Sequence, residues 1–124
     1  MYPYDTSERP PVAILPVQVT NAASGRMTSL DGKLDTGAGI SVLPLTAVKV
    51  LGLKSKTDVW VAGYDGLPTQ TPAYVVTVTV AGHTVEALTA IATPRSQILI
   101  GRDVLSHFVA TFDGKNQTFD LVDP

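Results

Sequence analysis

Hydrophobic and polar positions alternate along most of the chain, as they do in half-buried β-strands. The segment 44–52 instead predicts a short helix, because proline lies in its first turn and glycine follows its end. Residues 102–108 predict one or two further helical turns. The runs that predict strands are residues 12–20, 26–34, 56–62, 71–80, 84–92, 98–100, 109–112 and 118–122. The pattern therefore predicts a mostly β fold with one or two short helices.

Several positions refine this prediction. Pro16 lies inside the first run and indicates an edge strand or a bulge, because proline cannot donate to a strand ladder. Strands 56–62 and 71–80 flank the segment 63–68, whose two glycines and proline are typical of a hairpin tip. Trp60 and Tyr74 are expected to pack at the base of that hairpin. Residues 1–11 are expected to be a Pro-rich lead-in to one domain that spans residues 12–124.

Composition narrows the classes of function. The 124 residues are 44% hydrophobic and 16% charged, which suits one globular domain. With 9 Lys plus Arg against 11 Asp plus Glu, the net charge of -2 argues against nucleic-acid binding. The chain has no cysteine, and its two histidines, His83 and His107, lie far apart along the sequence. We therefore expect no metal, no cofactor and no thiol chemistry.

Membrane and nucleotide-binding signals are also missing from the sequence. No apolar run approaches the roughly 18 residues of a membrane span, and the N-terminus does not resemble a secretory signal. We expect a cytoplasmic protein without a membrane partner. Gly37 and Gly39 do not continue into a dinucleotide loop, because Val42 replaces the third small residue. Neither the Gly-x-Ser-x-Gly nor the His-Glu-x-x-His signature occurs.

One segment combines an apolar strand with a carboxylate on a tight turn. Leu34 precedes Asp35-Thr36-Gly37-Ala38, which by itself could be an ordinary turn between strands. A second segment, Ile98-Leu-Ile-Gly-Arg-Asp103, follows downstream, and the glycine-tipped hairpin lies between the two. In this order the segments resemble the retropepsin-like aspartic proteases over nearly the whole chain, residues 11–122.

The resemblance implies a closed β-barrel or sandwich with a flap hairpin and one or two short helices, equal to one half of the bilobal pepsin-type fold. It also implies an aspartic endopeptidase. Such enzymes activate a water between two carboxylates about 3 Å apart that share one proton, and they are the standard example of such a pair. This chain has one Asp-Thr-Gly, so the resemblance implies a homodimer with Asp35 of each subunit at the symmetry axis.

Roles for individual residues follow from the resemblance. Asp35 is the expected catalytic carboxylate, Thr36 is expected to hydrogen-bond across the dimer interface, and Gly37 allows close approach of the backbone. Ala38 stands where relatives often carry a hydroxyl that favours charged carboxylates, so we expect a mildly acidic optimum. Gly101, Arg102 and Asp103 are expected to be structural. The expected substrate-binding residues are Leu34, Ala38, Gly39, Ile40, Val42, Leu99 and, in the flap, Gly63, Tyr64, Asp65 and Gly66.

The chain departs from the family pattern at several positions. Gly39 and Ile40 replace acidic residues that usually follow the motif, so the partner of Arg102 stays open between Asp103 and an acid of the second subunit. Lys33 occupies a usually apolar position. We expect it to pair with Asp31, although in the groove it would attract acidic substrate side chains.

Two expectations concern assembly and activity. The C-terminal hairpin is expected to contribute to the dimer interface. The alternative function is a catalytically silent dimerisation or peptide-binding module of the same fold. The intact Asp-Thr-Gly favours the enzyme, because a binding module has no need of that carboxylate.

Overall fold

A computed structural model describes residues 1–62 and 66–123, which are mostly β-strand. The predicted mostly β fold with short helices is confirmed. In chain order the elements are β1 (Tyr2–Pro3), β2 (Ile14–Thr20), β3 (Met27–Leu34), β4 (Val42–Pro44), α1 (Leu45–Leu51), β5 (Thr57–Ala62), β6 (Pro68–Val80), β7 (His83–Thr93), β8 (Ile98–Ile100), α2 (Arg102–Leu105), β9 (Val109–Asp113) and β10 (Thr118–Val122).

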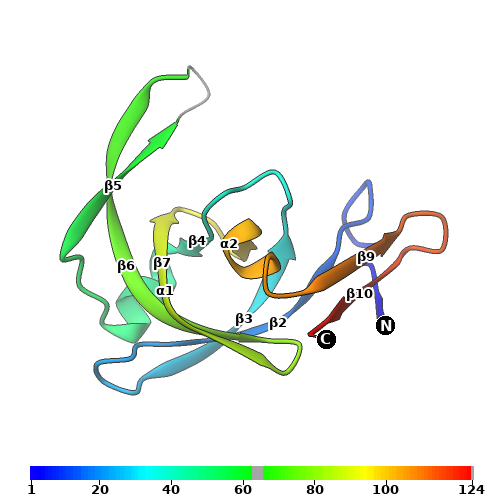
Figure 1. Cartoon of the computed structure of the whole chain (residues 1–124), viewed down its shortest axis with the longest axis horizontal. Coiled ribbons are helices and arrows are strands. Elements are labelled where there is room, and N and C mark those ends of the chain that lie inside the picture. The colour runs from blue at the N-terminus through cyan, green and yellow to red at the C-terminus, as the bar shows by residue number, and fades with distance from the viewer. Residues whose placement is uncertain (63–65, 124) are drawn as a thin grey trace.

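Six of these strands form a closed barrel. They are hydrogen-bonded in the order β2-β3-β8-β4-β7-β6, and β2 also pairs with β6, which closes the ring. The long strand β6 extends beyond the barrel, where its first half pairs with β5. The β5–β6 hairpin therefore projects from the barrel wall, as predicted for a flap (Figure 1).

Branched side chains, mostly from the barrel strands and with Leu51 from helix α1, fill the core. The largest fully buried ones include Leu43, Leu51, Ile98 and Ile100, together with valines of β2 and β6. Helix α1 begins directly after Pro44, which is extended and ends β4 instead of lying in the first turn as predicted. The helix ends at Gly52, whose left-handed φ of 62° confirms the predicted glycine at its end. Among the described residues, neither helix has the length and apolarity that crossing a bilayer requires.

Pro16 shows how a proline can enter a strand that is paired on both sides. Strand β2 pairs with β3 along its whole length, but its pairing with β6 starts only at Val17. Pro16 therefore lies where β2 has a single paired neighbour. The prediction of an edge applies to this end of β2 and not to the strand as a whole.

The expectation that Trp60 packs at the base of the hairpin is wrong. Its side chain is 69% exposed, opposite Gln70 on the solvent face of the β5–β6 hairpin. Successive strand residues point to opposite faces, so the half-buried Val59 and Val61 occupy the other face. Tyr74, which lies where β6 begins to pair with β7, is half-buried opposite Ala90.

The chain termini form a second, smaller sheet in the order β1-β10-β9. Phe119 of β10 is almost fully buried at its centre. The rings of Tyr2, Tyr4 and Phe112 surround Phe119 with centroid distances of 5.2, 5.9 and 6.4 Å. Aromatic packing of this kind joins the first residues of the chain to the C-terminal hairpin.

Gly32 provides a test of the barrel packing. A Cβ at this position would lie 2.5 Å from Cγ2 of Val17 and 3.2 Å from Cγ1 of Ile100, both of which are buried. We expect Gly32→Ala to lower the free energy of unfolding by about 1–3 kcal/mol, because a stiff β-branched neighbour must move. Chemical denaturation measures this. The control Gly114→Ala, with no atom within 4 Å of the added Cβ, should change it by less than about 0.5 kcal/mol; equal effects would contradict the packing.

The turn between β9 and β10 makes a prediction about titration. The backbone N–H of Asn116 and then its side-chain amide donate to the carboxylate of Asp113, at 3.0 and 2.8 Å, and lower the pKa of Asp113. The pKa of Asp113 is lower in the folded chain than in the unfolded chain. These hydrogen bonds therefore stabilise the fold at pH values above 3.8, the ordinary pKa of this group. That contribution is lost as the pH falls through the folded pKa.

Asn116→Ala removes the side-chain donor and keeps the backbone donor. We expect the pKa of Asp113 to rise part of the way to its ordinary value in an NMR titration. The pKa of Asp5, which the hydroxyl and N–H of Ser7 lower, serves as the internal reference and should stay unchanged. An unaltered pKa of Asp113 would contradict the assignment.

Candidate active site

Asp35 directly follows β3, at the point where that strand runs beside β8. The two strands are parallel, with Leu34 opposite Ile100, and the N–H of Asp35 donates to the Ile100 carbonyl at 2.9 Å. The ladder thus continues one residue past the strand and fixes the backbone of Asp35. Its side chain is half-buried.

The Asp-Thr-Gly-Ala segment forms a turn around the carboxylate. The N–H of Gly37 donates to Oδ1 of Asp35 at 2.8 Å, and the N–H of Ala38 donates to the Asp35 carbonyl at 3.2 Å. A Cβ on Gly37 would lie 3.1 Å from the same Oδ1, tighter than an ordinary contact. The turn therefore orients the carboxylate, and a side chain at its third position would press on that carboxylate.

Residues 101–102 lie much later in the chain and contact this turn. The N–H of Arg102 donates to the Ala38 carbonyl, and its Nη1 donates to the Thr36 carbonyl, both at 2.8 Å. A Cβ on Gly101 would lie 2.9 Å from the Ala38 oxygen and 3.0 Å from the Ile40 carbonyl carbon, so the two backbones touch. The predicted structural role of Gly101 and Arg102 has a direct geometric basis.

Asp103 and Ser41 form a second contact between the same segments. The N–H and hydroxyl of Ser41 donate to the two carboxylate oxygens of Asp103, at 2.9 and 2.7 Å, and Ser41 in turn accepts from the N–H of Gly101 at 3.1 Å. Both oxygens of Asp103 are thus engaged, and the ion pairs among the described residues do not include Arg102. Asp103 is therefore not the partner of Arg102 in the single chain.

Sequence reasoning did not single out Ser41. Its side chain is 1% exposed, yet it lies between the apolar residues Ile40 and Val42. A small hydroxyl within an apolar run was the available signal, because a buried hydroxyl needs a hydrogen-bonding partner.

The other predicted site residues surround the same turn or lie on the hairpin. Leu34 and Ile40 are half-buried, and Val42 of β4 lies opposite Leu99 of β8. Gly39 is exposed, with the guanidinium of Arg102 3.4 Å from the position of an added Cβ. Gly66 is exposed at the hairpin with a φ of 75°. The predictions for Gly63, Tyr64 and Asp65 lie outside the described residues.

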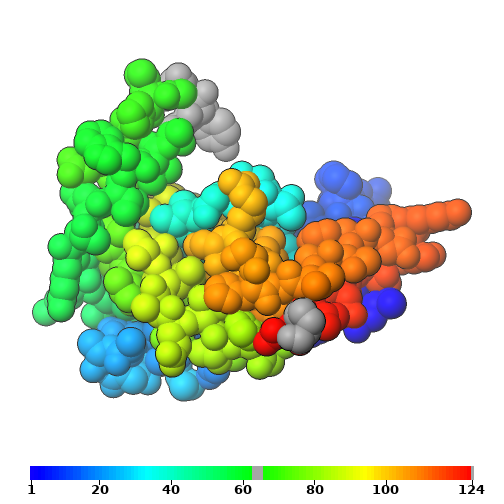
Figure 2. Space-filling view, viewed as in Figure 1, coloured from blue at the N-terminus to red at the C-terminus, as the bar shows by residue number. Residues whose placement is uncertain are grey.

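Asp35 opens on a cavity on the outer side of the barrel. A separate hollow lies between the β5–β6 hairpin, in green, and the loop that follows β3, in cyan (Figure 2); no described residue of that hairpin lines the cavity of Asp35. The cavity is lined by Tyr4, Val12, Ala13, Lys33, Leu34, Asp35, Thr36 and Phe112.

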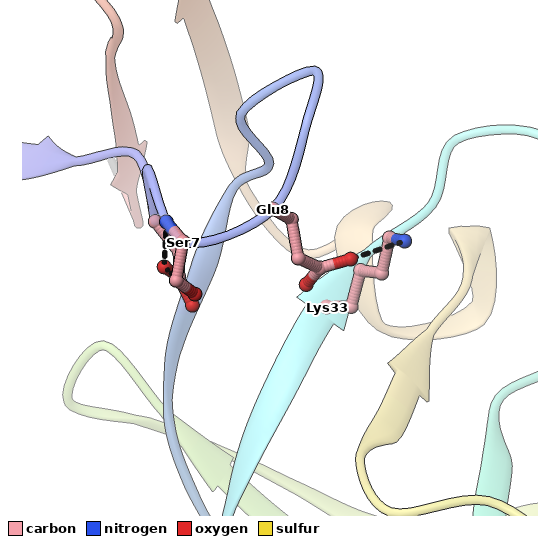
Figure 3. Close-up of polar contacts among 4 residues, drawn as sticks. Ser7, Glu8 and Lys33 are labelled. Atoms are coloured by element: carbon pink, nitrogen blue, oxygen red, sulfur yellow. Dashed lines mark hydrogen bonds and ion pairs between the residues drawn. The ribbon is translucent and has the colours of Figure 1, made fainter.

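The expected pairing of Lys33 with Asp31 is wrong. Lys33 Nζ lies 3.6 Å from Oε1 of Glu8, which belongs to the N-terminal segment (Figure 3). Asp31 lines a different cavity, with Pro16 and Gln97. Residues two apart on a strand are about 6.6 Å apart along it, so the nearby Glu8 provides the closer partner.

The closed barrel, the projecting hairpin and a carboxylate on an Asp-Thr-Gly turn braced by Gly-Arg-Asp together define a retropepsin-like aspartic protease. A family model for aspartyl proteases matches residues 15–104. The chain therefore belongs to the aspartyl protease family. The curated proteins give no match to it.

Solved viral proteases share the fold. The EIAV protease, solved in complex with the inhibitor HBY-793, is 23% identical with a TM-score of 0.59, over 77% of this chain and 86% of that chain. The simian foamy virus (mac) protease is 23% identical with a TM-score of 0.54, over 74% and 92%. The foamy viral protease-reverse transcriptase, solved with an RNA/DNA hybrid, is 22% identical with a TM-score of 0.60, over 79% and 12%.

The brace between Ser41 and Asp103 gives a testable prediction. Ser41→Ala leaves the N–H of Gly101 without its partner and removes one of the two donors to Oδ1 of Asp103, the other being the N–H of Val104, so we expect a loss of about 1–3 kcal/mol in the free energy of unfolding. Ser41→Thr keeps the hydroxyl and should lose less. Denaturant unfolding measures both, with Ser96→Ala, an exposed residue, as the control. An effect of Ser41→Ala no larger than that of the control would contradict the brace.

Proposed function

We propose that the chain is an aspartic endopeptidase that acts as a homodimer, with a water activated between Asp35 of the two subunits. The observation that carries this proposal is the oriented carboxylate of Asp35, which opens on a surface cavity from the only Asp-Thr-Gly in the sequence. One ionised carboxylate takes a proton from the water, while its protonated partner donates to the substrate carbonyl.

We infer that the second carboxylate comes from another copy. Asp103 is engaged by Ser41, Asp31 lines a separate cavity and Glu8 is paired with Lys33, so none of the three is placed to share a proton with Asp35. A two-fold axis next to Asp35 would bring the two identical turns together, and Thr36, which is exposed, could then bond across that axis.

Strand β9 supports a position for the interface. It is the edge of the β1-β10-β9 sheet, and its Val109 and Phe112 are 57% and 41% exposed. Exposed apolar edge strands pair readily with a second chain. Phe112 also lines the cavity of Asp35, so a copy that docks on β9 would lie beside that carboxylate.

The substrate is proposed to lie as an extended strand between the turn and the β5–β6 hairpin. Main-chain hydrogen bonds would hold it, and alternate side chains would enter pockets formed by apolar residues such as Leu34, Ile40 and Leu99. Closure of the hairpin would exclude water from the reaction. Because Ala38 brings no hydroxyl to the carboxylates, the proposed pH optimum is mildly acidic.

Cleavage of an unfolded protein between about pH 3 and pH 7, with and without pepstatin, tests this proposal. We expect wild-type cleavage that pepstatin inhibits and that Asp35→Asn lowers by at least about 10²–10⁴-fold, because the water loses its base. Asp31→Asn is the matched control, since it removes a carboxylate from the same strand but from another cavity.

The opposing outcomes separate the alternatives. Absence of wild-type cleavage over this range, with retained binding of peptides, would favour the silent peptide-binding module. Cleavage that survives Asp35→Asn would assign the reaction to another group. A cleavage rate that peaks at about pH 2 would overturn the proposed mildly acidic optimum.

A further inference from the structure

Lys33 lies on the same side of the barrel wall as the proposed catalytic carboxylate. Gly32, its neighbour on β3, faces the interior, where an added Cβ would meet Val17 and Ile100. Side chains alternate along a strand, so Lys33 points outward. It lines the cavity on which Asp35 opens. A substrate at Asp35 would therefore pass close to an ammonium group.

Among the other residues that line this cavity, Asp35 is the charged one. Tyr4, Val12, Ala13, Leu34, Thr36 and Phe112 complete the lining, and none of them is charged at neutral pH. The carboxylate that faces Lys33 comes from outside the lining, at Glu8.

Glu8 reaches Lys33 from a loop that closes on itself. The backbones of Asp5 and Val12 exchange hydrogen bonds of 2.8 and 3.2 Å, and Asp5 also holds the N–H and hydroxyl of Ser7. Figure 3 shows this loop carrying Glu8 over the end of β3, with its carboxylate turned to Lys33. The loop thus presents an acidic side chain at the edge of the cavity that Lys33 and Asp35 line.

The contact between Glu8 and Lys33 is readily exchanged. The two groups are 3.6 Å apart and their side chains are 40% and 35% exposed. Exposed ion pairs of this kind contribute little to stability, because water screens them and long side chains must be held in place. A carboxylate on a bound peptide, in a site from which water is partly excluded, would interact with Lys33 more strongly.

We propose that Lys33 is a specificity-determining residue that selects an acidic substrate side chain close to the scissile bond, and that Glu8 occupies its place when substrate is absent. This inference rests on the proposed protease function. The substrate would then carry one acidic side chain near the scissile bond, whereas the other proposed pockets accept apolar side chains.

The test uses a site that the wild-type protein cleaves in an unfolded protein. A peptide of that site is varied at each position around the scissile bond, with Glu or the isosteric Gln, at about pH 6, where a Glu side chain of a free peptide is largely ionised. We expect kcat/KM to favour Glu over Gln by about fivefold at one position. Lys33→Met should bring this ratio to about 1, and Glu8→Gln should raise it, because Lys33 is then uncompensated.

Lys49→Met is the control, because it removes an exposed charge from α1, away from the cavity. It should leave the ratio unchanged, which separates a local contact from an effect of net charge. A wild-type ratio near 1 at every position, or the same ratio in the wild type and in Lys33→Met, would overturn the inference.

Binding separates this inference from the proposed function. The same peptide pairs are titrated onto Asp35→Asn and onto Asp35→Asn combined with Lys33→Met. Tighter binding of the Glu peptide that disappears in the double variant supports the role of Lys33, even if no variant cleaves. Cleavage by the wild type without any dependence on Lys33 supports the protease and refutes this role.

Discussion

The position of Asp35 depends on backbone contacts with a segment about sixty residues later in the chain. Gly101 and Arg102 lie directly against the turn, and Asp103 holds Ser41 at its far end. Neither segment could fix the carboxylate alone, because a short turn on the surface has few contacts of its own. The closed barrel brings the two together by pairing β3 with β8 and β8 with β4. Hydrogen bonds between the two segments are thus concentrated beneath the carboxylate.

The elements that would contact a substrate or a second subunit project from the barrel. The β5–β6 hairpin leaves the barrel where β6 has lost its other neighbours, and the β1-β10-β9 sheet ends in an exposed edge. The loop of residues 5–12 closes on itself and carries Glu8 to Lys33. An arrangement in which the hydrogen-bonded end of β3 is bordered by projecting elements suits the proposed site, since substrate and partner subunit would both have to approach Asp35.

The elements that depend on local signals in the sequence were predicted correctly. The strand Ile98–Ile100, the helix between Pro44 and Gly52, and the two hairpins follow from alternation, proline and glycine, and the structure has them in those places. The Asp-Thr-Gly-Ala and Gly-Arg-Asp segments indicated the family by their order in the chain, and at Gly101 a side chain would meet the backbone of the facing segment. The contacts of Ser41 with Asp103 and of Lys33 with Glu8 join residues far apart in the chain, so no local pattern reveals them. Trp60 was misjudged because its large apolar ring suggested burial, whereas strand alternation places it on the solvent face.

The central claim is that one active site needs two Asp35 side chains from two copies. Wild-type and Asp35→Asn chains can be unfolded together, refolded and assayed at fixed total concentration while the wild-type fraction is varied. If only dimers of two wild-type chains are active, the rate falls with the square of that fraction, to about one quarter at an equal mixture. A rate that falls linearly, to about one half, would mean that a single chain supplies the whole catalytic group and would contradict the account.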